Sequence, residues 1–333
     1  MLNSICIYAS QLASCINHNR FKKPSDALET VWQRVAPASF RDALARNGIK
    51  TQEEAVRDIM TSNQTVRSLL VHAEDALTTS SSEVARGYEE ISTRLAEAEL
   101  KWEERKLVDD AMKKTLYTSF GTRQESVAFQ KIHARIPCRL DDTFYRSLVG
   151  EINGVQIFVG GKVDAISQDG CTVIEIKNRI NRLFYKLPLY EIIQVQTYLH
   201  LLPHVQSAKL VECLTKDDGA VLMNTIPIER DETMWETYIV PKLQGFVKYL
   251  LQILDDPLEQ DTYLQSRRRA SLVTAAINSF SIDKHSRPGP SHHPINQGPS
   301  NGQDYQHDTD SSQPVPVPQY VSHRLSVALP QEI

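Results

Sequence analysis

Two acids and a lysine, carried by two short apolar segments, are the residues of this chain best suited to chemistry. Asp164 lies in Gly161-Lys-Val-Asp-Ala-Ile, and Glu175 and Lys177 follow in Val173-Ile-Glu-Ile-Lys. Two carboxylates beside one lysine can hold a hard divalent cation and activate a water molecule. The set therefore predicts metal-assisted hydrolysis, and phosphodiester cleavage in particular.

The sequence around these residues predicts how they are brought together. Both segments are rich in β-branched residues, and Asp169-Gly170 between them is a turn signal, so we expect two paired strands at 162–167 and 171–177. Asp164 and Glu175 can then face one point, and Glu175 and Lys177 project from the same face. An acid pair on adjacent strands is often a simple surface pair. Unpaired carboxylates in buried apolar strands are costly, however, which favours a functional site.

Two further segments complete the expected site. Glu125 lies near the start of an expected helix through 125–129, and Gln194 and Tyr198 share one face of a helix expected at about 189–202. Taken alone, Glu125 is better interpreted as a solvated helix residue, and Gln194 as a cap or loop partner. Their order and spacing relative to the two acids favour a shared centre.

The expected roles follow from charge. The candidate ligands of Mg²⁺ or Mn²⁺ are oxygen donors: Asp164, Glu175, the carbonyl of Ile176 and, directly or through water, Glu125. Lys177 would orient the attacking water or stabilise the charge that develops on the phosphate, and Glu125 would assist. Gln194 would hydrogen-bond Lys177, the water or a phosphate oxygen. We therefore expect Lys177, Glu125 and Gln194 to be the catalytic residues.

Basic and aromatic residues alternate just after the lysine strand. The run Asn178–Lys186 contains Arg179, Arg182 and Lys186 together with Phe184 and Tyr185. Such a pattern suits phosphate contacts with base stacking, and the alternative is a flexible basic loop. The three basic residues are candidate DNA contacts.

Composition and periodicity divide the chain into four parts. Residues 1–37 predict a helix, a loop and a second helix capped by Ser25. Residues 38–118 predict a charged helical insertion with a break at Thr78–Ser82, read as a solvated helical hairpin or as a partner-binding coil. Residues 119–255 predict the catalytic core. Residues 262–333 are rich in Ser, Pro, Gly, Gln, His and Asn and predict a disordered tail.

Strands and helices follow one another within the expected core, which argues for an α/β domain. Asp231 is expected to cap the last helix, which runs to about residue 254. The expected strands lie at about 132–138, 143–150, 154–160, 162–167, 171–177, 207–215 and 220–229.

Bulk composition excludes several classes of protein. The 333 residues carry a formal charge of −4, so any nucleic-acid surface must be a local patch. The five scattered cysteines predict reduced thiols without a disulfide framework, zinc site or iron–sulfur cluster. No membrane span or signal peptide is expected. We expect an intracellular protein, in the nucleus or cytoplasm of a host cell if it is viral or eukaryotic.

Taken together, these motifs resemble the PD-(D/E)XK nuclease superfamily and, within it, the YqaJ-like viral recombinase (phage lambda exonuclease) family. The similarity covers about 7–35 and 119–254. Its motifs are Gly121-Thr-Arg-Gln-Glu125, Val163-Asp164-Ala, Glu175-Ile-Lys177, Gln194-Val-Gln-Thr-Tyr198, Ile228-Glu-Arg-Asp231-Glu and, at the N-terminus, Ala9-Ser-Gln11.

The resemblance implies a restriction-endonuclease-like core with a central mixed β-sheet flanked by helices. It also implies a Mg²⁺-dependent 5′→3′ DNA exonuclease that acts on linear duplex ends in recombination or repair, with a single-strand annealing protein as a possible partner and oligomer formation possible. Ser10 would meet the terminal phosphate, and Gln196 and Tyr198 would belong to the DNA-binding set. Asn3 stands where the family often has an arginine, and Gln11 where it has an acid.

Two alternatives share the metal-motif sequence. One is a RecB-like single-strand nuclease or a structure-specific endonuclease. The other is a nuclease fold that binds DNA without catalysis, against which the intact set of Asp164, Glu175 and Lys177 argues.

Overall fold

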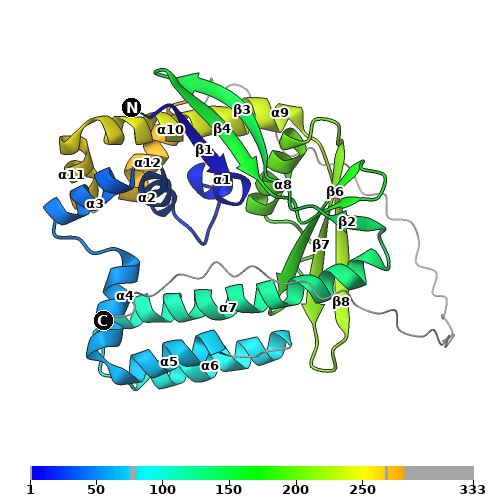
Figure 1. Ribbon diagram of the computed structural model, residues 1–333, viewed down its shortest axis with the longest axis horizontal. Helices are drawn as coiled ribbons and strands as arrows, with labels where there is room; N and C mark the ends of the chain where they lie inside the picture. The colour runs from blue at the N-terminus through cyan, green and yellow to red at the C-terminus, as the bar shows by residue number, and fades with distance from the viewer. Residues whose placement is uncertain (1, 76–79, 267–268, 281–333) are drawn as a thin grey trace, which may run out of the picture. The chain divides into compact units, whose positions relative to one another are not determined.

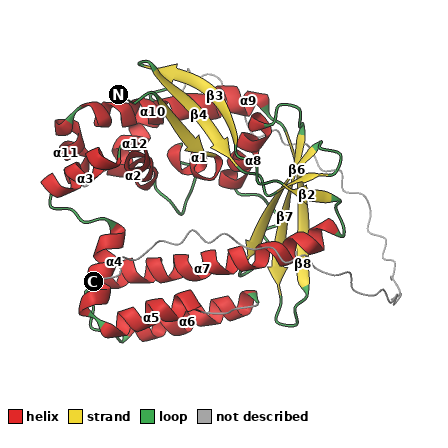
Figure 2. Cartoon of the chain, viewed as in Figure 1, coloured by secondary structure: helices red, strands yellow, loops and turns green. Residues whose placement is uncertain are grey.

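The computed structural model describes residues 2–75, 80–266 and 269–280, which form an α/β fold with helices flanking two mixed β-sheets (Figures 1 and 2). The expected fold class is confirmed, except that the strands divide between two sheets instead of forming one. The strands are β1 (Ser4–Tyr8), β2 (Cys138–Leu140), β3 (Tyr145–Ile152), β4 (Val155–Gly161), β5 (Ala165–Ser167), β6 (Thr172–Arg179), β7 (Ser207–Thr215) and β8 (Val221–Glu229).

The smaller sheet has the strand order β1-β4-β3, and the larger has the order β2-β5-β6-β7-β8. Strands β6 and β7 are parallel, so their connection must cross over, and helix α8 (Leu189–Leu201) lies in that crossover. Helix α8 also contacts β3 and β4 of the smaller sheet. Between the end of β4 and the start of β5, the segment 162–164 passes from one sheet to the other, and Asp164 lies at this junction.

The largest hydrophobic core joins the N-terminal and C-terminal helices to β1, β4 and α8. Trp32 is fully buried there, with edge-to-face contacts to Phe40 and Tyr263. The helices of this part are α1 (Ala9–Cys15), α2 (Pro24–Val35), α3 (Pro37–Arg46), α9 (Glu232–Met234), the π-helical turn η1 (Trp235–Ile239), α10 (Val240–Asp255), α11 (Pro257–Gln265) and α12 (Arg269–Asn278). This core holds α8, and therefore Gln194, against both sheets.

The expected helical insertion has a hydrophobic core of its own. It consists of α4 (Gln52–Ser62), α5 (Gln64–Asp75), α6 (Ser81–Ala96) and α7 (Trp102–His133). Ser80 caps α6 by accepting a hydrogen bond from the N–H of Glu83 at 3.2 Å. The expected break at Thr78–Ser82 thus includes a helix start, while residues 76–79 lie outside the described part. Helix α7 runs without interruption past residue 118, where the insertion was expected to end (Figure 1).

Several expected elements differ from the structure. Strand β1 was not predicted, because its apolar residues run directly into those of α1. The strand expected at 132–138 is wrong, since α7 continues to His133 and β2 begins at Cys138. Ser25 does not cap α2: Lys23 is the N-cap, and Pro24 begins the helix, where a missing N–H is harmless.

The disordered tail expected from residue 262 is wrong for residues 262–265 and 269–278, which belong to α11 and α12. Their buried residues, among them Tyr263, Leu264, Val273 and Ile277, anchor these helices to the main core despite the polar composition. The rest of the expected tail, 281–333, lies outside the described residues. Among the helices that the structure describes, none is long and apolar enough to cross a membrane.

Candidate active site

A β-hairpin places the two acids opposite each other. Strands β5 and β6 are antiparallel with Ala165 opposite Ile174, and Asp164 and Glu175 each lie one residue beyond this pair. The strand expected at 162–167 begins only at Ala165, so Asp164 lies in the bend directly before it. The turn expected at Asp169-Gly170 closes this hairpin, and Gly170 has a φ of 75°, which a residue without Cβ adopts readily. The acids therefore meet at the open end of the hairpin.

Asp164 is fixed by the backbone of the opposite strand. The N–H of Ile176 donates to Oδ2 of Asp164 at 2.7 Å. The N–H and C=O of one strand residue point to the same side of the strand, so the carbonyl of Ile176 also faces the Asp164 side. The expected role of the Ile176 carbonyl as a ligand beside Asp164 is compatible with this backbone geometry.

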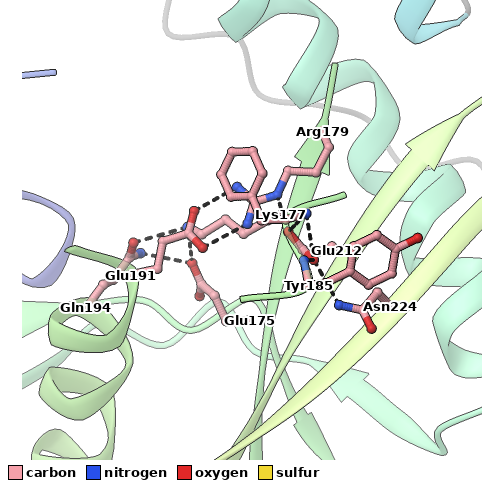
Figure 3. Close-up of polar contacts among 9 residues, drawn as sticks. Glu175, Lys177, Arg179, Tyr185, Glu191, Gln194, Glu212 and Asn224 are labelled. Atoms are coloured by element: carbon pink, nitrogen blue, oxygen red, sulfur yellow. Dashed lines mark hydrogen bonds and ion pairs between the residues drawn. The ribbon is translucent and has the colours of Figure 1, made fainter. Parts of the chain in front are cut away.

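Lys177 and Gln194 form a closed set of hydrogen bonds with Glu175 (Figure 3). Nζ of Lys177 donates to Oε1 of Glu175 at 2.6 Å and to Oε1 of Gln194 at 3.1 Å. Nε2 of Gln194 donates to the same Glu175 oxygen at 2.9 Å and to the hydroxyl of Tyr198 at 2.9 Å. One amide on α8 therefore positions both the lysine and the acid of β6.

Burial controls the ionisation of this set. Glu175 is 2% exposed. Burial raises its pKa to about 7, the charge of Lys177 opposes that rise, and Asp164 adds to it. Burial lowers the pKa of Lys177, but Glu175 and Asp164 outweigh it and hold this pKa above its usual value. Asp164 reaches solvent on one side, and the protein around its other sides raises its pKa.

One oxygen of this set lacks a partner. Oε2 of Glu175 is buried and accepts no hydrogen bond from any described residue. An unsatisfied buried acceptor costs about 1–3 kcal/mol, and more when it is charged. The adjacent Asp164 supplies another carboxylate, and two carboxylates with a carbonyl are ligands that hard divalent cations prefer. The residues therefore fit Mg²⁺ or Mn²⁺, which would satisfy Oε2.

Glu125 is more loosely connected to the site. It lies in the middle of α7 and not near a helix start, as was expected. Its charge contributes to the raised pKa of Asp164, and burial raises the pKa of Glu125 itself. In the described part of the chain, no three acidic, histidine or cysteine side chains lie close enough together to hold one ion. A contribution of Glu125 through water fits this arrangement better than direct ligation.

Arg179, which was expected to contact DNA, is instead held by protein partners, so its position does not favour that role. Its guanidinium is buried in an ion-paired network (Figure 3). It donates two hydrogen bonds to the carboxylate of Glu191 at 2.7 and 2.8 Å, and Nε donates to Glu212 at 2.7 Å. Both acids were missed, although Glu212 lies in the apolar run Lys209-Leu-Val-Glu-Cys-Leu, where a charge signals a buried partner.

Gln196 and Tyr198, expected in the DNA-binding set, also have protein partners. Gln196 is buried, donates to the carbonyl of Glu229 at 2.7 Å and accepts from the N–H of Asp231 at 2.9 Å, so it joins α8 to the end of β8. Tyr198 is buried, and its hydroxyl accepts the hydrogen bond from Gln194. Their burial favours a positioning role within the protein over a direct DNA contact.

The remaining expected contacts are on the surface. Ser10, Arg182 and Lys186 are all exposed. Ser10 is near the start of α1, next to Ala9, and Ala9 lies against Gly161 at the end of β4. A surface position is compatible with the DNA-binding role expected for each of the three.

No protein-family model and no curated protein matches the chain. Among solved structures, it is similar to an alkaline exonuclease, LHK-Exo, from Laribacter hongkongensis, with 20% identity, covering 54% of this chain and 93% of that chain. It is also similar to LHK-Exo in complex with dAMP (19% identity, 61% and 92% coverage) and to SSO0001 (17% identity, 66% and 94% coverage). The TM-score is 0.29 in each case, so the function is inferred from the site alone.

Proposed function

We propose that the protein is a metal-dependent nuclease that hydrolyses phosphodiester bonds in DNA. The observation that carries the proposal is the contact set of Glu175, Lys177 and Gln194 beside Asp164, with Oε2 of Glu175 left without a partner. Paired acids and a half-buried ammonium group in one place suit a reaction in which negative charge develops on a phosphate.

Each residue has a defined task in this proposal. Asp164, Glu175 and the carbonyl of Ile176 would hold Mg²⁺ or Mn²⁺. Such an ion, when bound, supplies Lewis-acid polarisation of the phosphate and a water of lowered pKa. Lys177, held by two acceptors, orients the attacking water and stabilises the developing negative charge. Gln194 holds the side chains of Lys177 and Glu175 in position through its hydrogen bonds to both.

The finer form of the proposal is a 5′→3′ exonuclease that acts on linear duplex ends in viral-type recombination or repair. The motifs shared with the phage lambda exonuclease family support this form, as does the exposed position of Ser10 near the start of α1. A single-strand annealing protein is the proposed partner.

The direct test compares digestion of end-labelled linear duplex and of closed circular DNA, with Mg²⁺ or with EDTA. We expect the wild type to degrade linear DNA only when Mg²⁺ is present, and Asp164→Asn to lose this activity while remaining folded. Asp142→Asn is the matched control, because Asp142 is exposed and makes no ion pair among the described residues. It is expected to keep full activity.

The other outcomes decide between the alternatives. Cleavage of closed circles would replace the exonuclease with an endonuclease that uses the same site. Binding of DNA without cleavage in Mg²⁺ or Mn²⁺, unchanged by Asp164→Asn, would instead establish a non-catalytic binding protein.

A further inference from the structure

A groove of about 850 Å³ opens between the loop that contains His18 and the segment from Asn181 to Tyr190. Its charged lining residues are Arg20, Arg182 and Lys186, and no acid lines it. All three are exposed, and none forms an ion pair within the described ranges. An anionic ligand therefore fits this groove.

The groove adjoins the candidate active site through the first turn of α8. Tyr190 lines the groove and lies one helical turn before Gln194 of the site, on the same face of α8. A polyanion that lies in the groove therefore ends near the hydrolytic residues.

Tyr185 stands out in this groove because of its backbone and its exposure. Its φ is 57°, in the left-handed region that residues with a Cβ seldom adopt. Its side chain is also 71% exposed. Unfavourable backbone conformations persist where the surrounding structure enforces them, and they are concentrated at functional sites.

Here a fully buried acid enforces the conformation (Figure 3). Glu212 accepts hydrogen bonds from the N–H of Phe184 at 3.0 Å, the N–H of Tyr185 at 3.1 Å and Nδ2 of Asn224 at 2.9 Å. The guanidinium of Arg179 lies 4.0 Å from the centre of the Phe184 ring. The backbone below Tyr185 is therefore held on several sides, while its ring is presented to solvent.

A second exposed aromatic ring, Phe21, contacts two residues that line the groove, Tyr190 and Arg20. Phe21 is 70% exposed, contacts Tyr190 edge to face at 5.9 Å, and lies under the guanidinium of Arg20 at 4.6 Å. Aromatic faces next to basic side chains bind single-stranded nucleic acids, because unpaired bases stack on the rings while Arg and Lys contact the phosphates. Bases inside a duplex have both faces covered and cannot stack in this way.

We propose that the groove binds an unpaired stretch of the DNA strand, with a nucleobase stacked on Tyr185 and phosphates at Arg182, Lys186 and Arg20. The proposal rests on the proposed function for the kind of nucleic acid, and it identifies an unpaired strand end, such as one separated from a duplex end, as the part of the DNA that reaches the site.

The test measures oligonucleotide binding by fluorescence anisotropy with the full chain in EDTA, where cleavage is not expected. Two labelled probes are used: an oligothymidylate and an abasic strand of equal length and charge. Tyr185→Ala is expected to weaken binding of oligothymidylate by roughly 5- to 100-fold and to leave binding of the abasic strand unchanged. Tyr185→Trp is expected to retain binding and to show tryptophan fluorescence quenching when the base-bearing strand binds.

Trp102→Ala is the matched control, since Trp102 is equally exposed at 69% but lies at the start of α7 in the insertion. It is expected to bind both probes as the wild type does. The proposal is overturned if Tyr185→Ala binds oligothymidylate normally, or if it loses affinity for both strands equally. If Tyr185-dependent binding is found but Mg²⁺ produces no cleavage, the proposed function fails and the groove assignment remains. If Mg²⁺ produces cleavage but binding does not depend on Tyr185, the groove proposal is rejected and the proposed nuclease function stands.

Discussion

Both the oxygen and the nitrogen of the Gln194 amide form hydrogen bonds within the candidate site. This neutral residue therefore helps to fix the geometry of the site, as the charged residues do. Its oxygen accepts from Lys177, and its nitrogen donates to Glu175 and Tyr198. Residues that orient metal ligands in this way are typically worth about 10- to 100-fold in metal affinity or activity. We expect Gln194→Ala to reduce the DNA cleavage rate by about this factor.

Tyr198→Phe is the control for this prediction, because it keeps the buried ring and removes only the hydroxyl that Gln194 contacts. It should cost much less activity than Gln194→Ala in the same end-labelled digestion assay. Equal losses in the two variants would mean that the hydrogen bond between Gln194 and the Tyr198 hydroxyl, and not the contacts of the amide with Lys177 and Glu175, determines the rate.

Glu175 predicts a pH dependence of stability in the metal-free protein. Burial raises its pKa from 4.5 in the unfolded chain to about 7 in the fold, so the folded state binds the proton more tightly. The resulting stabilisation is complete below pH 4.5 and is lost as the pH rises through about 7. The free energy of unfolding, measured with urea in EDTA, should therefore fall more between pH 5 and pH 8 for the wild type than for Glu175→Gln.

A constant stability difference between the two proteins across this pH range would contradict the raised pKa. Mg²⁺ should reduce the loss seen for the wild type, because a cation competes with the proton for the same carboxylate.

At the scale of elements, the network of Arg179 ties β6 to β7 and to α8 through Glu212 and Glu191. Removing Glu191 leaves Arg179 paired with Glu212, but two guanidinium N–H groups lose their buried acceptor. An unsatisfied buried donor costs about 1–3 kcal/mol, and more for a charged group. We expect Glu191→Ala to lower the free energy of unfolding by at least this amount.

Glu232→Ala is a matched control, since Glu232 also pairs with an arginine, Arg230, at 2.8 Å but is itself exposed. An exposed ion pair contributes no more than about 1 kcal/mol to stability. The unfolding midpoint of Glu232→Ala in urea should therefore change little. If Glu191→Ala weakens DNA binding without loss of stability, Arg179 acts on the ligand and not on the fold.

The elements that were predictable from the sequence are those fixed by local patterns. The β5–β6 hairpin follows from Asp169-Gly170 and two apolar runs, and α8 follows from its own periodicity. The partners of Arg179 depend on the parallel register of β6 with β7, which sets Arg179 opposite Leu214 and Lys177 opposite Glu212. No local pattern encodes that register, so a basic residue in a basic run was read as a DNA contact.

At the scale of the whole molecule, α7 connects two hydrophobic cores. Its first half contributes Val108, Met112 and Leu116 to the core of the insertion, and its second half contributes Ala128 and Ile132 to the core beneath the larger sheet. Glu125 lies in this second half, and Nδ2 of Asn178 on β6 donates to the carbonyl of Gly121 at 3.3 Å. The insertion and the site therefore share one continuous helix.

Thr118→Pro tests whether that continuity matters, at the position where the sequence suggested a domain boundary. Thr118 is exposed in mid-helix, so proline there removes a helical hydrogen bond and clashes with the preceding turn without disturbing a core side chain. We expect it to lower the free energy of unfolding by about 3 kcal/mol or more and to slow DNA cleavage by displacing Glu125. Thr118→Ala should be neutral or slightly stabilising, because alanine favours helix. If Thr118→Pro keeps wild-type stability in urea and wild-type cleavage, the insertion is a separate unit whose attachment to the site is not needed.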